Sequence, residues 1–457
     1  MHVARWLALV CATLVVAACQ APADDRGDAA PEAVRADDAV DEPETADAPA
    51  VDADTEPATG GDDDTSEEAD ASTSSPPEPP RRFTIAATGD ILPHTAVIHR
   101  AADYGAESGE DYDFRPMFAE IAPVLGAADL AICHLEVPLS TDNADVFGGG
   151  DRRTAGGAPL FTSPWQLATA SGDAGFDACS TAHNHSSDAG EAGIVATLDA
   201  LEDAGVVPAG TYRTPAETEA PVLHDMEGVT VAHLSATYGL NVPLSEEAAW
   251  MVDTIDVDTL VADAEIARDA GAEFVVVSLH HGLEYQIDPS DNQLARSDEL
   301  LASGAIDLLL GHHAHVVQPI DRFHDRVAVH GLGNLLSNMD PAVTGPPTQD
   351  GVIVLLEVTE DAETGAFDVT DVSYVPTWVD RDTHVIVDVG AALQNDDLGE
   401  QRRADLEASW DRTVAGITLT GADAWGVAPL SGSAWLESGR AQRAGPAGVL
   451  ARRGTAS

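Results

Sequence analysis

The stretch IDLLLGHHAH at residues 306–315 joins a short apolar run to three histidines. The run 306–310 has the composition of a buried strand, and the histidines follow where that strand would end. Residues two apart share one face of an extended segment, so His313 and His315 can serve a single site. Imidazole is a preferred ligand of divalent transition metals. The stretch therefore predicts a strand whose carboxyl end carries part of a metal site.

Four other short blocks place polar groups directly after an apolar run: TGD at 88–90, HLE at 134–136, HNH at 183–185 and HHG at 280–282. Taken alone, most of these residues would be turn, surface or core side chains. Donors this far apart in sequence converge only if the strands lie side by side, as in a parallel sheet that gathers ligands at its carboxyl ends. Because all five blocks share this position, we expect one metal site with one or two ions. A mixed set of Asp, Glu, Asn and His favours Mn, Fe or Zn over Ca or Mg.

Strand-like runs and helical periodicity alternate from residue 83 onwards, which indicates an α/β domain. The expected strands cover residues 83–88, 129–134, 178–182, 229–236, 274–279, 306–310 and 327–331. Expected helices cover 258–270 and 292–303, each followed by a glycine, and a third has an apolar stripe that includes Ile194 and ends at Gly205. Ser163-Pro164 has the form of an N-cap followed by proline at the first helical position.

A later part of the chain has strand periodicity without intervening helices, at 352–358, 367–375 and 385–389. These segments either pair antiparallel at a sheet edge or complete a second sheet. We expect the folded domain to span 81–385. Residues 386–457 are expected to form a C-terminal helix and a poorly ordered tail, the tail beginning near residue 430.

Charge is the extreme feature of the composition. The 457 residues contain 79 acidic and 22 basic residues, all of the latter arginine, for a formal net charge of −57. Such a surface argues against nucleic acid and anionic membrane faces as partners, and it attracts cations. Adaptation to high salt would give the same composition.

Four cysteines are present, and two of them, Cys133 and Cys179, fall within expected strands. We expect two small buried thiols. A disulfide between neighbouring strands is the alternative outside the cytoplasm, and sequence alone does not give the distance that decides it.

The N-terminus has the form of an export signal, with Arg5 before the apolar run 6–16. The run ends in Val16-Ala17-Ala18-Cys19, which resembles the lipobox of bacterial lipoproteins. The resemblance implies cleavage before Cys19, lipidation of its thiol and an extracytoplasmic protein anchored to a bacterial membrane; ordinary cleavage with an incidental cysteine is the alternative. Residues 20–80 are expected to be a disordered acidic linker, since 22–80 hold 20 acidic residues and two arginines.

Around these blocks the chain resembles the bacterial capsule-synthesis CapA family, also called the poly-γ-glutamate biosynthesis family. The matching pieces are Gly89-Asp90, Leu135-Glu136, Asn184-His185 with Asp188 and Gly190, His280-x-Gly282-x-Glu284-Tyr285, Gly311-His312-His313-x-His315-Val316 with Gln318-Pro319, and Leu332-Gly333-Asn334. The resemblance covers about residues 83–380. It implies a calcineurin-like metallophosphatase-type sandwich of two mixed β-sheets flanked by helices, with metal at one end.

Site residues carried over from this resemblance fall into three groups. The implied metal ligands are Asp90, Glu136, Asn184, His280, His313 and His315. The implied catalytic residues are His185, which would donate a proton to the leaving group, and Asp188. The implied substrate-binding residues are Glu284, Tyr285, His312 and Asn334.

Four positions depart from the family pattern. His134 and His183 each stand where the family has Asn, His281 stands for Trp, and Leu335 stands for Phe. Three of these changes add imidazole and could enlarge the ligand set, so His134, His183 and His281 form a second tier of candidates.

Three functions are consistent with the sequence. The first is an exported, lipid-anchored, metal-dependent hydrolase that acts on a cell-envelope polymer or a phosphoester. The second is a non-catalytic polymer-binding accessory subunit of a membrane complex for poly-γ-glutamate synthesis or export. The third, a structural envelope lipoprotein, is the weakest, because structural metal sites rarely need so many donors.

Overall fold

A computed structural model describes residues 79–226, 228–439 and 448–450. The described residues from Pro80 onwards form one compact unit. The expected leader, Cys19 and nearly all of the expected linker lie outside the described residues. Among the described residues, no helix has the length and apolar character needed to cross a membrane.

The first sheet has nine strands and is mixed. Its parallel part runs β1 (Arg82–Ile91), β2 (Leu130–Leu135), β6 (Ala178–Ser180) and β7 (Val207–Ala209). Its antiparallel part continues from β1 through β15 (Asp350–Glu360), β16 (Phe367–Val379) and β17 (Ile386–Asp388), and the short strands β14 (Asn334–Leu336) and β18 (Ala428–Pro429) pair with β1 and β16. The late strands thus pair antiparallel at the edge of this sheet, which decides between the two expected arrangements.

The second sheet has seven strands and is also mixed. Its parallel centre consists of β9 (Val229–Thr237), β10 (Phe274–His280), β11 (Leu308–His312) and β13 (Arg326–Val329). Antiparallel strands β12 (Ile320–Phe323), β8 (Leu223–Met226) and β19 (Gly448–Leu450) extend it. A small third sheet contains β3 (Leu139–Ser140), β5 (Pro159–Pro164) and β4 (Phe147–Arg153).

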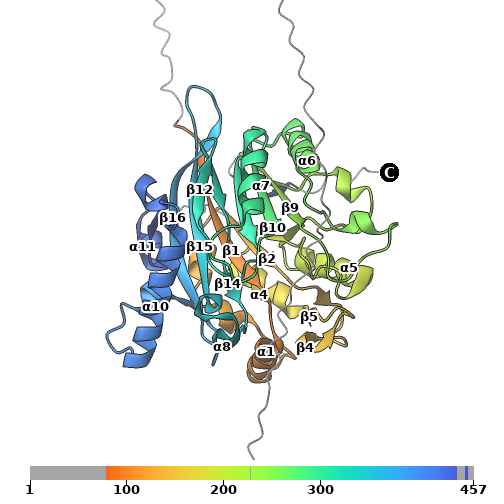
Figure 1. Cartoon of the computed structure of the whole chain (residues 1–457), viewed down its shortest axis with the longest axis vertical. Helices are drawn as coiled ribbons and strands as arrows, with labels where there is room; N and C mark the ends of the chain where they lie inside the picture. The colour runs from red at the N-terminus through yellow and green to blue at the C-terminus, as the bar shows by residue number, and fades with distance from the viewer. Residues whose placement is uncertain (1–78, 227, 440–447, 451–457) are drawn as a thin grey trace, which may run out of the picture. The chain divides into compact units, whose positions relative to one another are not determined.

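An apolar core joins the inner faces of the two large sheets. Phe83 of β1 meets Phe274 of β10 edge to face, with ring centroids 5.7 Å apart, and alternate residues of both strands continue this core. The outer face of the first sheet packs against α1 (Thr95–Ser108), α4 (Gln166–Ala174) and α5 (Gly190–Asp203). The outer face of the second packs against α6 (Val257–Asp269) and α7 (Asp291–Ala302), which lie over β9 and β10 in Figure 1. The expected sandwich of two mixed sheets flanked by helices is confirmed.

The C-terminal part of the chain covers the β15–β16 side of the first sheet (Figure 1). Helix α10 (Glu400–Ile417) is tied to the start of β15 by Arg412, which donates two hydrogen bonds of 2.6 and 2.8 Å to the Asp350 carboxylate. The expected tail is partly structured, since Gly432–Glu437 forms α11 and buries Trp435.

Most expected elements agree with the structure to within one to three residues. Helices α5, α6 and α7 are followed by Gly205, Gly271 and Gly304, all with the positive φ typical of helix C-termini. The prediction for Ser163-Pro164 is wrong. Both residues end β5 and pair with β3, and α4 begins at Gln166 with Trp165 as its N-cap. The residue before a proline favours extended backbone, and this preference prevailed over capping.

The two strand cysteines are not thiols in the structure. Cys133 of β2 and Cys179 of β6 are register partners in the parallel ladder, with Cα atoms 4.4 Å apart, and they form a disulfide. Our expectation of free thiols is therefore wrong. The sequence does not state which strands are neighbours, and that adjacency alone brings the two sulfurs together.

Candidate metal centre

The carboxyl ends of both large sheets meet at one place. In the first sheet Asp90 is the register partner of His134, and in the second His280 is the register partner of His312. Contacts cross between the sheets: His134 Nε2 lies 2.9 Å from His280 Nδ1, and His312 Nδ1 lies 3.2 Å from Asp90 Oδ1. Donors separated by more than 200 residues are thus side by side, as the strand-end argument predicted.

Three overlapping groups of buried donors could each hold a metal ion. Within each group, one ligand atom per residue lies within 4.8 Å of the others. The groups are Asp90 with His134 and His312, His134 with Glu136 and His280, and Glu136 with His313 and His315. Because adjacent groups share a member, this cluster has room for more than one ion.

Asp90 lies at the centre of the cluster and is almost fully buried. Its carboxylate contacts His315 Nδ1 at 3.0 Å and accepts a hydrogen bond from the His313 backbone at 3.3 Å. Burial opposes ionisation, but the hydrogen bonds of His312 and His315 outweigh it and hold the pKa of Asp90 far below its usual range. Asp90 is therefore an anion poised among imidazoles.

Glu136 provides the clearest sign that the cluster suits a cation. Its side chain is fully buried, and neither carboxylate oxygen has a hydrogen-bond partner among the described residues. The closest imidazole nitrogens are those of His280 and His315, at 3.6 and 3.7 Å. Burial raises the pKa of Glu136 well above its usual value. A buried carboxylate without partners costs several kcal/mol, on the order of the penalty for a desolvated ion, so this residue fits a cation supplied from outside the chain.

Asn184 and His280 approach the same spot from different sheets. Asn184 lies in the loop after β6, and its Oδ1 is 3.0 Å from Nε2 of His280 at the end of β10. Both side chains are buried. An amide oxygen and an imidazole nitrogen that face one another, with Glu136 beside them, form a mixed O/N ligand set that suits a divalent transition metal.

The loop after β11 holds His313 and His315 in strained backbone conformations. Their φ angles are +87° and +55°, values that non-glycine residues rarely adopt. His313 Nδ1 has no hydrogen-bond partner among the described side chains, which leaves it available as a ligand. Burial lowers the pKa of His315, but the attraction of Glu136 and the hydrogen bond to Asp90 prevail and raise it to about 10. The acidic groups around His315 therefore favour a positive charge at this point.

His185 and Asp188 form a separate pair beside the donor cluster. His185 Nδ1 lies 2.7 Å from Asp188 Oδ2, which also accepts a hydrogen bond from the backbone of Phe161. The ring of Phe161 packs edge-on against His185, with centroids 4.8 Å apart. These contacts orient the imidazole and direct its Nδ1–H at the Asp188 carboxylate, which accepts the hydrogen bond, so Nε2 is the nitrogen left for proton exchange with a substrate.

The four residues expected to bind substrate lie in two different environments. Glu284 and Tyr285 are exposed, and the Tyr285 ring is 6.2 Å from that of His315. Asn334 is fully buried: its amide nitrogen donates to the backbone oxygens of His315 and Thr348, and its Oδ1 lies 3.1 Å from His315 Nδ1. His312 is likewise buried against Asp90. The geometry therefore suits Glu284 and Tyr285 for substrate contact and Asn334 for positioning His315.

The second-tier histidines also differ from one another. His134 lies within the cluster, with both ring nitrogens in hydrogen bonds. His183 is buried against His134, with ring centroids 5.7 Å apart, and its Nδ1 accepts a bond from the His185 backbone. Burial and the neighbouring His330 lower the pKa of His281 to about 3, and no metal-donor group described here includes it.

Tyr238 is a site residue that sequence reasoning missed. It directly follows β9, and its ring lies 4.7 Å from that of His313 and 6.1 Å from that of His280. It is 53% exposed, so it forms part of the rim. The rule that found the five blocks, a polar group at the end of an apolar strand, would have found Tyr238 had phenol been counted.

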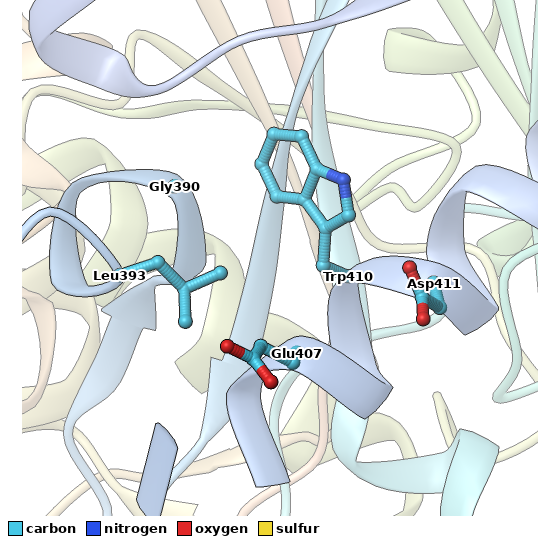
Figure 2. A pocket seen from close by; sticks show the side chains of 5 residues that line it. All are labelled: Gly390, Leu393, Glu407, Trp410 and Asp411. Carbon is cyan, nitrogen blue, oxygen red and sulfur yellow. The ribbon is translucent and has the colours of Figure 1, made fainter. Parts of the chain in front are cut away.

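A cavity of about 460 Å³ lies elsewhere in the fold, against α10 and α9 (Val389–Ala392). Figure 2 shows its lining residues, Gly390, Leu393, Glu407, Trp410 and Asp411. None of them belongs to the donor cluster, so this cavity is separate from the metal centre.

The family model for the bacterial capsule synthesis protein PGA_cap matches residues 84–339. The capsule biosynthesis protein CapA of Bacillus anthracis is 26% identical over 56% of this chain and 60% of its own length. The PGA biosynthesis protein CapA of Bacillus subtilis is 31% identical over 44% of this chain and 51% of its own length. A probable polyglutamine synthesis accessory protein of Mycobacterium tuberculosis is 27% identical over 35% of this chain and 45% of its own length. The chain thus spans less than two thirds of these curated relatives.

Solved structures resemble the fold more distantly. A phosphatase from Mycoplasma pneumoniae covers 69% of this chain and 98% of its own, at 11% identity and a TM-score of 0.37. The similarity to the calcineurin-like phosphoesterase YfkN of Bacillus subtilis covers 74% of this chain and 97% of that protein's chain, at 12% identity and a TM-score of 0.35. Similarities at this level carry no argument about activity.

Proposed function

We propose, on the premise that this chain belongs to the bacterial capsule synthesis protein family PGA_cap, that it is a metal-dependent hydrolase. Its substrate would be a cell-envelope polymer or a phosphoester intermediate of that polymer. The observation that carries the proposal is Glu136, a fully buried carboxylate that has no hydrogen-bond partner among the described residues and is enclosed by donors from both sheets. A site built only for stability would satisfy both oxygens of this carboxylate with hydrogen-bond donors of the chain.

The proposed ligands are those that the family resemblance implies, namely Asp90, Glu136, Asn184, His280, His313 and His315. The donor groups and the Asn184–His280 contact support this set, although the groups also contain His134 and His312. A bound divalent ion, with Mn, Fe or Zn favoured by this donor mixture, supplies Lewis acidity that polarises the scissile group. Tyr238, Glu284 and Tyr285 on the rim would contact the substrate.

His185 is the proton donor in this proposal. Asp188 holds its Nδ1 at 2.7 Å, which sets the ring orientation and leaves Nε2 to give a proton to the leaving group. Phe161 covers one side of the ring and limits its rotation. Removal of this acid should slow turnover by about 10²–10⁴-fold, the usual contribution of a general acid, with metal content unchanged.

The test combines metal analysis with turnover. The purified chain is analysed for bound metal, then assayed on a phosphoester panel and on a γ-glutamyl peptide in parallel. Asp90→Ala and Asn184→Ala should both lose metal and activity while retaining the wild-type circular dichroism spectrum. His324→Asn, which alters an exposed imidazole paired with Asp298, is the matched histidine control for His185→Asn. Wild-type turnover in both Asp90→Ala and Asn184→Ala would exclude hydrolysis at this site.

A second function is favoured by one comparison. The Mycobacterium tuberculosis relative is named as a probable polyglutamine synthesis accessory protein, which suggests a non-catalytic role in binding or guiding polymer within a membrane complex. The net charge of −57 opposes long-range attraction of an anionic polymer, so a bound cation or a local arginine patch would have to make the contact. Metal-dependent polymer binding without turnover of any substrate in the panel would support this second function.

Export and lipid anchoring belong to the same proposal. The signal-like run 6–16 and Cys19 support them, and the Cys133–Cys179 disulfide is consistent with an oxidising compartment. Cys19→Ala should release the protein from the membrane fraction into the soluble fraction. Metabolic labelling with a radioactive fatty acid gives a direct readout.

A further inference from the structure

Four buried residues form a continuous hydrogen-bonded line that ends at the metal centre. Ser180 Oγ lies 2.7 Å from His134 Nδ1, His134 Nε2 lies 2.9 Å from His280 Nδ1, and His280 Nε2 lies 3.0 Å from Asn184 Oδ1. Ser180 also lies within hydrogen-bonding distance of the Cys133 backbone oxygen, at 3.3 Å. Ser180, His134 and His280 are at most 1% exposed. Water therefore does not replace any of these contacts.

Both ring nitrogens of His134 are occupied by this line. A ligand role would require His134 to give up either Ser180 or His280, and each alternative would leave a buried polar group unpaired. The ring is also covered on one face by His312, with centroids 4.1 Å apart and planes 15° from parallel. By contrast, His313 Nδ1 and His312 Nε2 have no hydrogen-bond partner among the described residues. The position of His134 suits orientation of a ligand better than ligation.

The line can carry its hydrogen bonds in either of two directions, because a neutral imidazole has one donor and one acceptor nitrogen. In one direction Ser180 donates to His134, His134 Nε2–H donates to His280 Nδ1, and His280 Nε2–H donates to Asn184 Oδ1. A metal ion at Asn184 and His280 needs the lone pair of His280 Nε2, so that proton must leave. His280 then carries its proton on Nδ1 and donates to His134 Nε2, His134 donates from Nδ1 to Ser180, and Ser180 donates to Cys133 O. Each ring keeps one proton in both states. Because the closed line excludes water, the proton released from His280 Nε2 and the one regained at Ser180 Oγ are exchanged with solvent during transient opening of the site.

We propose that Ser180 and His134 are positioning residues for the metal ligand His280, and that their hydrogen-bond line reverses direction when the metal binds. The inference rests on the proposed function only for the presence of the metal. A ligating histidine generally donates its second N–H to an acceptor that fixes its tautomer and orientation. Here that acceptor is the imidazole of His134, which stands at a position where the CapA family pattern has asparagine.

Nitrogen-15 NMR of the histidine rings tests the reversal directly. The full chain is compared without metal and with Zn²⁺, which is diamagnetic, and the His134 and His280 signals are assigned with His134→Asn and His280→Asn. We expect the proton of both rings to move from Nε2 to Nδ1 on addition of Zn²⁺. A His134 ring whose tautomer does not change, or whose nitrogen shows a metal-ligand shift, would overturn the proposal.

Metal affinity gives a second, independent test. Ser180→Ala should weaken Zn²⁺ binding roughly tenfold and His134→Leu by up to about 100-fold, the range found for outer partners of ligating histidines. The double variant should bind Zn²⁺ no more weakly than His134→Leu does, because Ser180 acts only through His134. His134→Asn keeps an acceptor for His280 and should restore most of the affinity. Full additivity of Ser180→Ala and His134→Leu would contradict the line.

Ser278→Ala is the matched control. Ser278 is a buried serine on β10, two residues before His280, and it lies 3.0 Å from His233 in a serine–histidine pair that does not reach the donor cluster. This variant should leave Zn²⁺ affinity unchanged, whereas an equal loss in Ser278→Ala and Ser180→Ala would reduce the effect to general packing and overturn the inference.

The outcomes also separate the two proposals. If Zn²⁺ binds and reverses the line but no substrate is turned over, the hydrolase fails and the line stands. If turnover is normal but His134 keeps its tautomer when Zn²⁺ is added, the hydrogen-bond line fails as a proposal and the hydrolase stands.

Discussion

Two buried carboxylates in this fold have opposite surroundings. Asp350, at the start of β15, is 2% exposed and receives two hydrogen bonds from Arg412 and one of 2.7 Å from Ser409. Glu136, after β2, is fully buried and has no hydrogen-bond partner among the described residues. Both carboxyl groups have pKa values raised by burial, but Asp350 receives hydrogen bonds from a guanidinium, whereas the nearest basic groups to Glu136 are the imidazoles of His280 and His315, at 3.6 and 3.7 Å. The difference separates a carboxylate that joins α10 to a sheet from one that the described residues leave without a hydrogen bond and that therefore suits a cation.

The largest expected effect comes from removing the open carboxylate. Glu136→Gln should abolish metal-dependent stabilisation, which for an ion present at 100 to 1,000 times its Kd amounts to about 2.7–4.1 kcal/mol. Without metal, the variant should be as stable as wild type or more so, because a desolvated ionisable group has been neutralised. Thermal unfolding with and without Mn²⁺ or Zn²⁺ measures both the metal-dependent stabilisation and the stability of the metal-free protein. A metal-dependent rise in Tm equal to that of wild type would remove Glu136 from the ligand set.

Removing the charge of the paired carboxylate, Asp350, should lower stability and leave metal affinity unchanged. Asp350→Asn leaves the Arg412 guanidinium without its counter-ion and should cost about 2–3 kcal/mol of unfolding free energy. This is below the 3–5 kcal/mol range of fully buried pairs, because the Arg412 side chain is 30% exposed. Urea unfolding measures the loss, and isothermal titration should find metal affinity unchanged. A loss of metal affinity in Asp350→Asn would erase the contrast between the two carboxylates.

Asp253 represents an intermediate case. Its carboxyl accepts a hydrogen bond of 2.5 Å from the neutral Tyr212 hydroxyl, and burial raises its pKa to about 7. The folded state then holds the proton more tightly than the unfolded state, whose value is near 3.8. Stability from this group is complete below about pH 4 and is lost as the pH rises through about 7, with a slope of up to ~1.4 kcal/mol per pH unit.

Comparison of wild type with Asp253→Asn across pH 4–8 isolates this term. The difference in unfolding free energy should change with pH in favour of the variant as pH rises. A constant difference would show that the pKa of Asp253 is not raised on folding, because the Tyr212 hydrogen bond then offsets the effect of burial.

The smallest expected effect calibrates the others. Ser290 caps α7 in a reciprocal arrangement with Gln293, in which each side chain bonds the other's backbone. Ser290→Ala should cost about 1 kcal/mol, typical of an N-cap, and should leave metal binding intact. A metal-affinity change in this variant would indicate that any loss of stability weakens the site, and the Glu136 result would then need the same correction.

Local features of the fold were predictable because they depend on residues near one another in sequence. The apolar runs of β1, β10 and β11 and the glycine ends of α5, α6 and α7 follow from composition and periodicity. The donors at strand ends were predictable for the same reason, since parallel strands share a carboxyl edge. Ser163 shows the limit even locally: capping and the pre-proline preference compete, and pairing with β3 accompanies the extended outcome.

The sequence by itself determined which residues stand at the ends of strands, because periodicity and turn chemistry act over a few residues. It also placed the candidate metal donors, because their positions follow from those ends. Only tertiary structure decided which strands became neighbours, and with that the Cys133–Cys179 disulfide and the Arg412–Asp350 pair. It also decided that His134 meets His280 across two sheets, because such contacts depend on how two separate sheets pack, and no local interaction encodes that packing.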